Sequence, residues 1–290
     1  MLLSLLINKN GVLINMISCI TYNILADLYT DKYTPERYPD IDNPNILCWE
    51  NRLELIRKKI TIVDPNVICL QEVVLKTIKE DFIDYFTEYD SFSHTVSKKR
   101  TTPIGNIILW KKELFKCENV TANSCGIYVT LINSDNKKVR IGNVHLAAGL
   151  YESAQKRVSQ LVSCMKSFGN YSGVICGDFN DEIKEENETK EGNETKEGNE
   201  TKERNNDKIK GISLYELIKI LHKNNFVCHV DDQTCCVFNK SRNTHKFWSF
   251  DHIISKNINV NTFPINETKT TIPSNLEPSD HYMIPFHIMI

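Results

Sequence analysis

The sequence predicts an α/β fold in which strands and helices form layers. Residues 17–25 are rich in β-branched side chains and alternate in polarity, which is typical of a strand. Apolar residues recur at helical spacing over residues 45–62, and residues 67–70 form a short apolar run typical of a buried strand. A strand, a helix and a second strand in this order favour a layered α/β sheet.

Turn residues and hydrophobic spacing divide the rest of the first half. Residues 27–44 are polar and contain prolines and tyrosines, which predicts a surface loop. Asp64-Pro65-Asn66 should end the first helix, because proline cannot continue it. The elements expected after it are a helix at 77–86, a strand at 105–110, and hairpin strands at 126–132 and 138–146.

The second half continues the alternation of helices and strands. Residues 152–168 have an apolar face at helical spacing, and residues 173–176 form an apolar run that ends in Gly177-Asp178-Phe179-Asn180. The remaining expected elements are a helix at 212–221 and strands at 225–231, 235–239, 248–254 and 282–290. Residues 248–254 contain an acid inside an apolar run, and burying an acid is costly unless it is paired or binds something.

Length and composition indicate a globular protein without a global charge field. The 290 residues suffice for one large domain or two small ones, and the hydrophobic fraction of 41% argues against a disordered chain. The net charge is only −2, so attraction to a charged substrate must come from local patches. Residues 98–100 and 111–112 are the candidate basic patches, although such runs are more often solvated loops.

Cysteine usage and the amino terminus bear on compartment. Ten cysteines are scattered and several stand in apolar runs, as in a reduced compartment, so we expect the cytoplasm, with the nucleus as the alternative. A zinc site near residues 228–245 is disfavoured, because no CxxC pair has a matching partner pair. Residues 1–15 suggest a leader outside the fold, which would then span residues 16–290. No run approaches membrane-spanning length, so no membrane partner is expected.

A six-residue repeat interrupts the second half. Asn187-Glu188-Thr189-Lys190-Glu191-Gly192 recurs at 193–198 and, with one change, at 199–204. This period is too short for a solenoid unit, and the segment has almost no apolar residues. We therefore expect residues 184–209 to be a disordered low-complexity insertion in the domain, without a catalytic role.

Polar residues suited to phosphate chemistry stand at the ends of, or inside, several expected strands. Asp178 and Asn180 would point to the same side, because side chains alternate along an extended chain. A carboxylate beside a carboxamide can hold a hard metal ion or orient a water, although Gly, Asp and Asn are also common in ordinary turns. The complete set is Asn23, Glu72, His145, Asp178, Asn180, Asp251, Asp280 and His281. Strands that end together in a sheet would bring these groups into one cleft.

The motifs that carry these residues resemble the endonuclease/exonuclease/phosphatase superfamily. They occur in that family's order and span residues 17–290: Tyr22-Asn23, Leu70-Gln71-Glu72, Val144-His145-Leu146, Gly177-Asp178-Phe179-Asn180, Asp251-His252-Ile253 and Ser279-Asp280-His281. Within the superfamily, the chain is most similar to the deadenylase branch, which includes nocturnin and the 2′,5′-oligoadenylate phosphodiesterases. The branch similarity rests on residues 22–27, 49–52, 68–73 and 157–160.

The resemblance implies a fold, a metal and a role for each residue. The fold would be a four-layer α/β sandwich, with two mixed sheets face to face and helices outside. Mg²⁺, or alternatively Mn²⁺, would be bound by Glu72 with Asn23 close by, and Asp280 would help with a second metal. Asp178 would activate the attacking water and Asn180 would orient it. His145 would contact the scissile phosphate, and His281, held by Asp251, would stabilise the phosphorane oxygens.

Several functions remain open at this level. The leading expectation is a metal-dependent phosphodiesterase, similar to deadenylases and 3′-exonucleases, with RNA or oligoadenylate as its nucleic-acid partner. The alternatives are a DNA nuclease acting at abasic sites, a phosphatase of inositol phosphates, and a lipid phosphodiesterase. A catalytically dead binding module is disfavoured, because every catalytic position is occupied.

An aromatic pair before Asp251 is the candidate base-binding element. In the branch that the chain resembles, an aromatic residue shortly before the matching aspartate stacks on the substrate base. Phe247 and Trp248 occupy this place and are adjacent, so they should point to opposite faces, one to the core and one to the cleft. The alternative is that both belong to the core.

Overall fold

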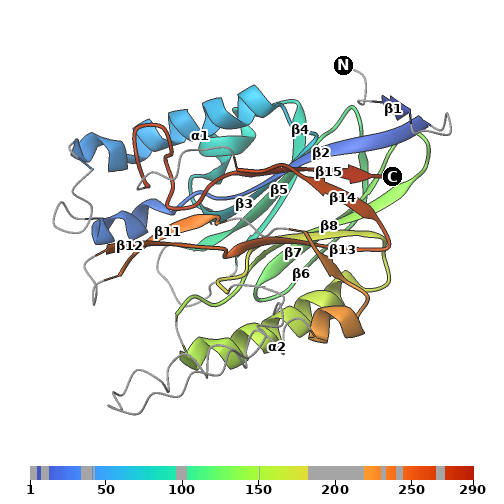
Figure 1. Ribbon diagram of the computed structural model, residues 1–290. Helices are drawn as coiled ribbons and strands as arrows, with labels where there is room; N and C mark the ends of the chain where they lie inside the picture. Colours follow the sequence, from blue (N-terminus) through green and yellow to red (C-terminus); the bar gives the residue numbers. More distant parts are fainter. Residues whose placement is uncertain are drawn as a thin grey trace, which may run out of the picture.

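Two β-sheets lie face to face, and one long helix covers the outer face of each, as the computed structural model shows (Figure 1). The structure describes residues 5–7, 13–33, 41, 43–95, 103–149, 151–181, 219–229, 233–239, 244–265 and 272–290. The expected insertion at 184–209, the basic residues 98–100 and most of the expected helix 212–221 lie outside these residues. The four-layer α/β sandwich is confirmed.

The first sheet combines the two ends of the described chain. Its order is β14 (Asn259–Thr262), β15 (Ile284–Met289), β2 (Leu13–Asn23), β3 (Val67–Val74), β5 (Ile104–Lys111) and β4 (Tyr89–Thr95), and β1 (Leu5–Ile7) also pairs with β2. Strands β2 and β3 are parallel, with α1 (Trp49–Val63) between them in the chain. Residues 5–7 of the suggested leader thus pair with residues 13–15.

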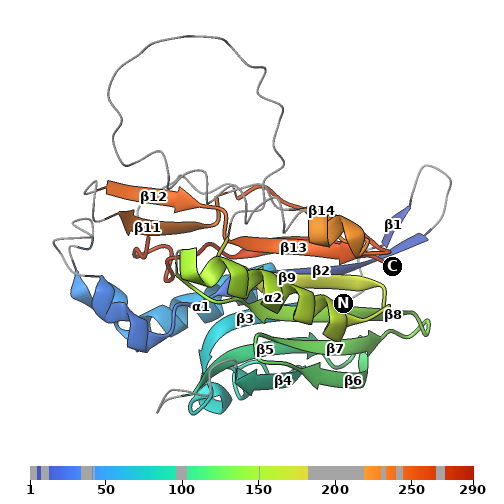
Figure 2. The ribbon, with the colours of Figure 1, turned by 90° about the horizontal axis from the view of Figure 1, so that it is seen from below.

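The second sheet carries most of the polar strand ends. Its order is β10 (Val227–Cys228), β13 (Asp251–Lys256), β9 (Gly173–Asp178), β8 (Lys138–His145), β7 (Gly126–Ile132) and β6 (Lys116–Ala122). Strands β8 and β9 are parallel and connected through α2 (Tyr151–Phe168). A separate hairpin, β11 (Cys235–Asn239) and β12 (Thr244–Trp248), lies beside the start of β13 (Figure 2).

The alternation of side chains along the strands gives each face of a sheet its own core. Ile17, Cys19 and Val67 of the first sheet meet Ile141 and Val174 of the second between the two sheets. The opposite faces pack under the helices, with Ile56 of α1 over the first sheet and Leu161 of α2 over the second. A strand that is buried on both faces needs apolar residues on both, which explains the continuous apolar runs in the sequence.

The inner faces turn from apolar to polar at one end of the sandwich. On β9 the inward positions run Val174, Cys176 and then Asp178, and on β8 the inward Ile141 is followed by Asn143 and His145. The same change occurs on β2, β3 and β13, where the inward polar residues are Thr21, Asn23, Gln71 and Asp251. The polar residues therefore gather at a single end of the inter-sheet layer.

The two helices bear out most of the helical prediction and correct its details. Helix α1 begins at Trp49 rather than at Asn45, because residues 44–47 form a separate 3-10 turn. It ends at Asp64, whose left-handed conformation and N–H donation to Ile60 close the last turn before Pro65. The helix expected at 77–86 is only a short π-helical segment, Lys79–Ile83. None of the helices within the described residues is long and apolar enough to cross a membrane.

The strand prediction was wrong for one strand in the second half and for several edge strands. Residues 248–254 are not one strand, because β12 ends at Trp248 and pairs with β11, whereas β13 begins at Asp251 and pairs with β9. The structure describes residues 225–229 of the expected strand 225–231, and within these only Val227–Cys228 is a strand. The edge strands β4, β6 and β14 were missed, and β6 is exposed at every position, so it carries no apolar signal.

Candidate functional site

Three predicted site residues form one row across the second sheet. Strand pairing places His145 of β8 opposite Asp178 of β9, and Asp178 opposite Asp251 of β13. All three have the parity of the inter-sheet face and stand at its polar end. Residues directly opposite on neighbouring strands have side chains a few ångströms apart, so the register alone brings these groups together.

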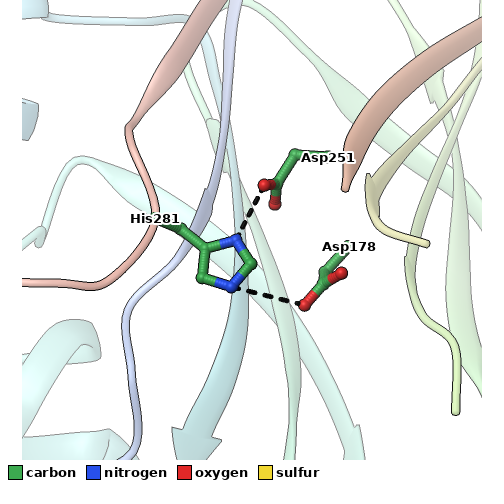
Figure 3. A group of neighbouring side chains, drawn as sticks. All are labelled: Asp178, Asp251 and His281. Carbon is green, nitrogen blue, oxygen red and sulfur yellow. Dashed lines mark hydrogen bonds and ion pairs between the residues drawn. The ribbon is translucent and has the colours of Figure 1, made fainter. Parts of the chain in front are cut away.

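His281 completes this row from the other sheet. It follows Ser279-Asp280 just before β15, and its Nδ1–H donates to Asp251 Oδ2 at 2.7 Å (Figure 3). Its Nε2 lies 3.7 Å from Asp178 Oδ2. Burial lowers the pKa of His281, but the carboxylates of Asp251 and Asp178 outweigh burial and raise it to about 10. The imidazole is therefore a cation at neutral pH, with Nε2–H facing the centre of the site.

Asp178 is held by neutral donors and flanked by two imidazoles. Its Oδ2 accepts from Asn23 Nδ2 at 2.9 Å and its Oδ1 from the Asn180 N–H at 2.8 Å. His145 Nε2 lies 3.6 Å from Oδ2 on the side away from Asp251. Burial raises the pKa of Asp178 above its ordinary value, partly offset by the nearby imidazoles. A carboxylate with a raised pKa is a better proton acceptor, as general-base chemistry requires.

Glu72 reaches the site through an irregularity in the first sheet. The pairing of β3 with β5 shifts register between Leu70 and Val73, and Glu72 in this bulge has a φ of 62°. A left-handed conformation is unfavourable for a residue with a long side chain and is found at functional sites. The bulge turns Glu72 so that its carboxylate accepts from Asn23 Nδ2 at 3.3 Å and from the Ala26 N–H at 2.9 Å. Its Oε1 also lies 3.9 Å from His145 Nε2.

The donor set fits a hard divalent cation. Glu72 and Asp178 present carboxylate oxygens at the same polar end, joined through the amide of Asn23. In the part of the chain that the structure describes, neither forms an ion pair with a lysine or arginine. Ligand atoms of Asp178, Asp251 and His281 also lie within 4.8 Å of one another. Carboxylate oxygens are what such cations bind.

Comparison with known proteins decides the family. A model of the endonuclease/exonuclease/phosphatase family matches residues 20–281, which include every site residue above. The chain belongs to this family. As a member of the endonuclease/exonuclease/phosphatase family, it is a hydrolase of phosphoester bonds. A search of curated protein sequences found no match.

Solved structures of the endonuclease/exonuclease/phosphatase family share the fold. ANGEL2, a 2′,3′-cyclic phosphatase in complex with adenosine-2′,3′-vanadate, is 14% identical with a TM-score of 0.69, over 95% of this chain and 96% of that one. The human Nocturnin catalytic domain with bound sulfate is 16% identical with a TM-score of 0.58, over 94% and 93%. D. rerio TDP2 with a single-strand DNA product is 12% identical with a TM-score of 0.58, over 94% and 98%.

Two predicted site residues of this family member are placed beside the centre rather than in it. The Asp280 carboxylate accepts from the Tyr33 hydroxyl and lies outside the group formed by Asp178, Asp251 and His281. Asn180 has a φ of 53°, and its Nδ2 donates to the Leu146 carbonyl at 3.1 Å, so its side chain braces the loop after β8. The second-metal role of Asp280 and the water-orienting role of Asn180 stay predictions.

The aromatic pair before Asp251 points to two different environments. Phe247 packs against a small buried cluster that includes Cys236 and Tyr282. Trp248 stacks on Phe250, with ring centroids 5.5 Å apart, and Lys246 Nζ lies 3.4 Å from its ring centroid. Both side chains are half-buried. Of the two, Trp248 is the one that lies outside the core clusters, and base stacking by it stays a prediction.

A buried amide network behind the site was missed by the sequence analysis. Asn143 Nδ2 donates to the Leu70 and Ile107 carbonyls at 2.9 Å each, and its Oδ1 accepts from Gln71 Nε2 at 2.8 Å. Asn143 belongs to the second sheet and its partners to the first, so its side chain connects the two sheets by hydrogen bonds beside the bulge that carries Glu72. The only available signal was the presence of amides at inward positions in otherwise apolar strands.

Two arginines hold the loops around the site, and both belong to the motifs on which the branch similarity rests. Arg52 of α1 is fully buried and donates from NH1 to the Ile24, Leu25 and Pro278 carbonyls, joining the end of β2 to the segment before His281. Arg157 of α2 donates from Nε to Asp181 Oδ2 at 2.9 Å and from NH1 to the Ala147 and Gly149 carbonyls. The motifs were visible in the sequence, but their bonding partners were not.

Proposed function

We propose that the protein is a Mg²⁺-dependent phosphodiesterase that hydrolyses RNA or oligoadenylate ends, in the manner of a deadenylase or 3′-exonuclease. The observation that supports it is the Asp178 carboxylate flanked by His145 and His281 at 3.6 and 3.7 Å, beside the carboxylate of Glu72. This is a base flanked by two imidazoles, and the protonated His281 is suited to stabilise a phosphate whose oxygens gain charge.

Each side chain has one task in this mechanism. Asp178 takes a proton from the attacking water, because burial raises the pKa of its carboxyl and prepares it as a base. His281 directs Nε2–H at the phosphorane oxygens, and Asp251 holds its ring in one orientation through Nδ1. His145 binds the scissile phosphate from the opposite side of Asp178.

Glu72 is the residue that would hold the cation, with Asp178 and Asn23 beside it. A bound Mg²⁺ would neutralise the phosphate charge and lower the pKa of a coordinated water. Mn²⁺ has similar ligand preferences and is the alternative. The chain itself contributes the fixed positions of the carboxylates, which the Asn23 amide and the Ala26 N–H set without adding charge.

Base stacking by Trp248 would strengthen the binding of ends that carry a base. The ring stacks on Phe250, and Lys246 Nζ lies 3.4 Å from its centroid, so a base would stack there by displacing this exposed lysine. We further propose a cytoplasmic location, with the nucleus as the alternative. None of the ten cysteines, all of which the structure describes, forms a disulfide, as expected where thiols stay reduced. This includes Cys125 and Cys164, whose Sγ atoms lie only 3.4 Å apart.

A digestion panel tests the proposal. Poly(A) RNA, 2′,5′-oligoadenylate, adenosine 2′,3′-cyclic phosphate, abasic DNA and inositol phosphates are each incubated with the protein and Mg²⁺. We expect cleavage of the RNA or oligoadenylate substrates, lost on chelation of divalent cations and in His281→Gln. Preferred cleavage of abasic DNA or an inositol phosphate would overturn the substrate class, and cleavage that survives chelation would overturn the metal dependence.

A further inference from the structure

The two members of the Asp251–His281 pair come from different sheets. Asp251 begins β13 of the second sheet, whereas His281 lies just before β15 of the first. Their side chains nevertheless meet at 2.7 Å. Neither sheet fixes this distance by itself, because no strand pairing joins β13 to β15. Packing between the two sheets brings these backbones near each other. Hydrogen bonds through a third element connect them directly.

Hairpin β11–β12 is that element, and Thr234 at its start contacts both sides. The Thr234 hydroxyl oxygen accepts from the Phe250 and Asp251 N–H groups, both at 3.0 Å. Its carbonyl accepts from the Tyr282 N–H at 2.8 Å, and its own N–H donates to the Trp248 carbonyl at 2.7 Å. Thr234 is fully buried. One residue thus bonds the backbones that flank Asp251 and the backbone that follows His281.

The residues after Thr234 continue the same attachment. Cys235 forms an isolated bridge with His281, and the Cys236 N–H donates to the Asp280 carbonyl at 2.9 Å. Residues 234–236 therefore run alongside residues 280–282 while the hairpin runs into β13 through residues 249 and 250 (Figure 2). These contacts are between backbones, so only the Thr234 hydroxyl depends on the identity of a side chain.

We propose that Thr234 is a positioning residue that sets the geometry of the Asp251–His281 pair. The Phe250 and Asp251 N–H groups lie where the chain leaves β12 for β13, and the hydroxyl supplies the acceptor that they share. Without it, the buried Asp251 N–H loses this acceptor, and the start of β13 must move to find another. Because Asp251 orients the His281 ring, such a shift changes where Nε2–H points during the reaction.

The test compares three variants. Thr234→Val keeps the shape and removes the hydroxyl, Thr234→Ser keeps the hydroxyl, and Thr130→Val removes a buried hydroxyl that binds Arg140 away from the site. We measure kcat and KM with bis(p-nitrophenyl) phosphate and the best substrate of the panel, and the thermal midpoint of each protein. In ¹⁵N-histidine-labelled protein we record the downfield proton signal of His281 Nδ1–H, assigned by its loss in Asp251→Asn.

The expected result separates positioning from stability. Thr234→Val should lower kcat by about 10- to 100-fold, as the loss of a partner that orients an active-site ligand does, and leave KM nearly unchanged. It should also shift or broaden the Nδ1–H signal, whereas Thr234→Ser restores both readouts. Thr130→Val should destabilise the protein without changing either readout. If Thr234→Val does not fold, Thr234→Ala removes the hydroxyl without an added methyl group.

Several outcomes would overturn the inference. They are an unchanged kcat in Thr234→Val, a lowered kcat with an unchanged Nδ1–H signal, failure of Thr234→Ser to restore either readout, and an equal loss of kcat in Thr130→Val. The kinetic part rests on the proposed function, but the proton signal does not. A wild-type protein inactive on the whole panel would overturn the proposed function, and the signal would still decide the role of Thr234.

Discussion

Replacing Asp251 with asparagine should reveal the protonation state of His281 through the pH dependence of the reaction. The substitution keeps the size of the side chain and removes the charge that lies 2.7 Å from His281 Nδ1. Burial alone lowers the pKa of a histidine, and Asp251 is the first of the groups that raise it here. Without that carboxylate the pKa should fall towards, or below, its ordinary value of 6.5.

The size of the effect follows from the two pKa values. With a pKa of about 10, nearly all His281 side chains are protonated between pH 7 and 9. With a pKa of 6.5, the protonated fraction falls by roughly 4-fold at pH 7, 30-fold at pH 8 and 300-fold at pH 9. The sign is that of a raised pKa. The protonated imidazole predominates in both proteins well below pH 6.5, and as the pH rises the variant loses its proton at a lower pH than the wild type does. The ratio of wild-type to variant kcat should therefore rise by about 70-fold from pH 7 to pH 9.

The assay is a pH profile of kcat at saturating Mg²⁺ with a soluble phosphodiester. Ionisations that do not depend on Asp251 cancel in the ratio. Asp81→Asn is the matched control, because Asp81 is also buried but its carboxylate accepts from Thr77, which is not a site residue. Its profile should match the wild type. A ratio for Asp251→Asn that does not change with pH would refute the protonation argument and leave only an orienting role.

The remaining predictions address the metal, the base pocket, the amide network and the insertion. Glu72→Ala should abolish Mg²⁺-dependent cleavage and Mg²⁺ binding in calorimetry without unfolding the protein, because Glu72 lies in a bulge at the cleft; full activity would exclude it as a ligand. Trp248→Ala should raise KM for oligoadenylate by the equivalent of about 1–3 kcal/mol and leave hydrolysis of a base-free phosphodiester unchanged. Phe247→Ala should mainly lower the thermal midpoint. If neither variant changes the preference for oligoadenylate over the base-free substrate, the stacking proposal is wrong. Asn143→Ala should lower the free energy of unfolding by about 2–5 kcal/mol in urea titrations, since several buried partners lose their bonds; a change below about 1 kcal/mol would contradict this account. Deleting residues 185–206 should leave turnover and the thermal midpoint nearly unchanged, and a large loss of either would show that the segment is not passive.

The local sequence carried most of the site because the site stands where buried strands end. An apolar run that ends in Asp178 or His145 is visible without any structure, since a strand buried on both faces has to be apolar until it reaches the cleft. The helix stop at Asp64-Pro65 is equally local. The order of these motifs along the chain was enough to indicate the family, and with it the four-layer fold.

Elements without a buried face, and features set by pairing across a sheet, could not be predicted from the local sequence. The exposed edge strand β6 has no buried face, so its pattern does not differ from that of a loop. The break between Trp248 and Asp251 exists because the two sides pair with different sheets, and no property of residues 249 and 250 alone requires it. The left-handed conformation of Glu72 follows from the bulge against β5, which is formed by pairing across the sheet.

The sequence by itself therefore determined which side chains are candidates for the chemistry, and the tertiary structure decided how they are held. His145, Asp178 and Asp251 could be chosen from residue type and place, but their alignment in one row is a matter of strand register. The supporting residues Asn143 and Thr234 bond mainly to backbone groups. Every residue has such groups, so the partners of these side chains leave no mark on the sequence and appear only when distant strands are brought together.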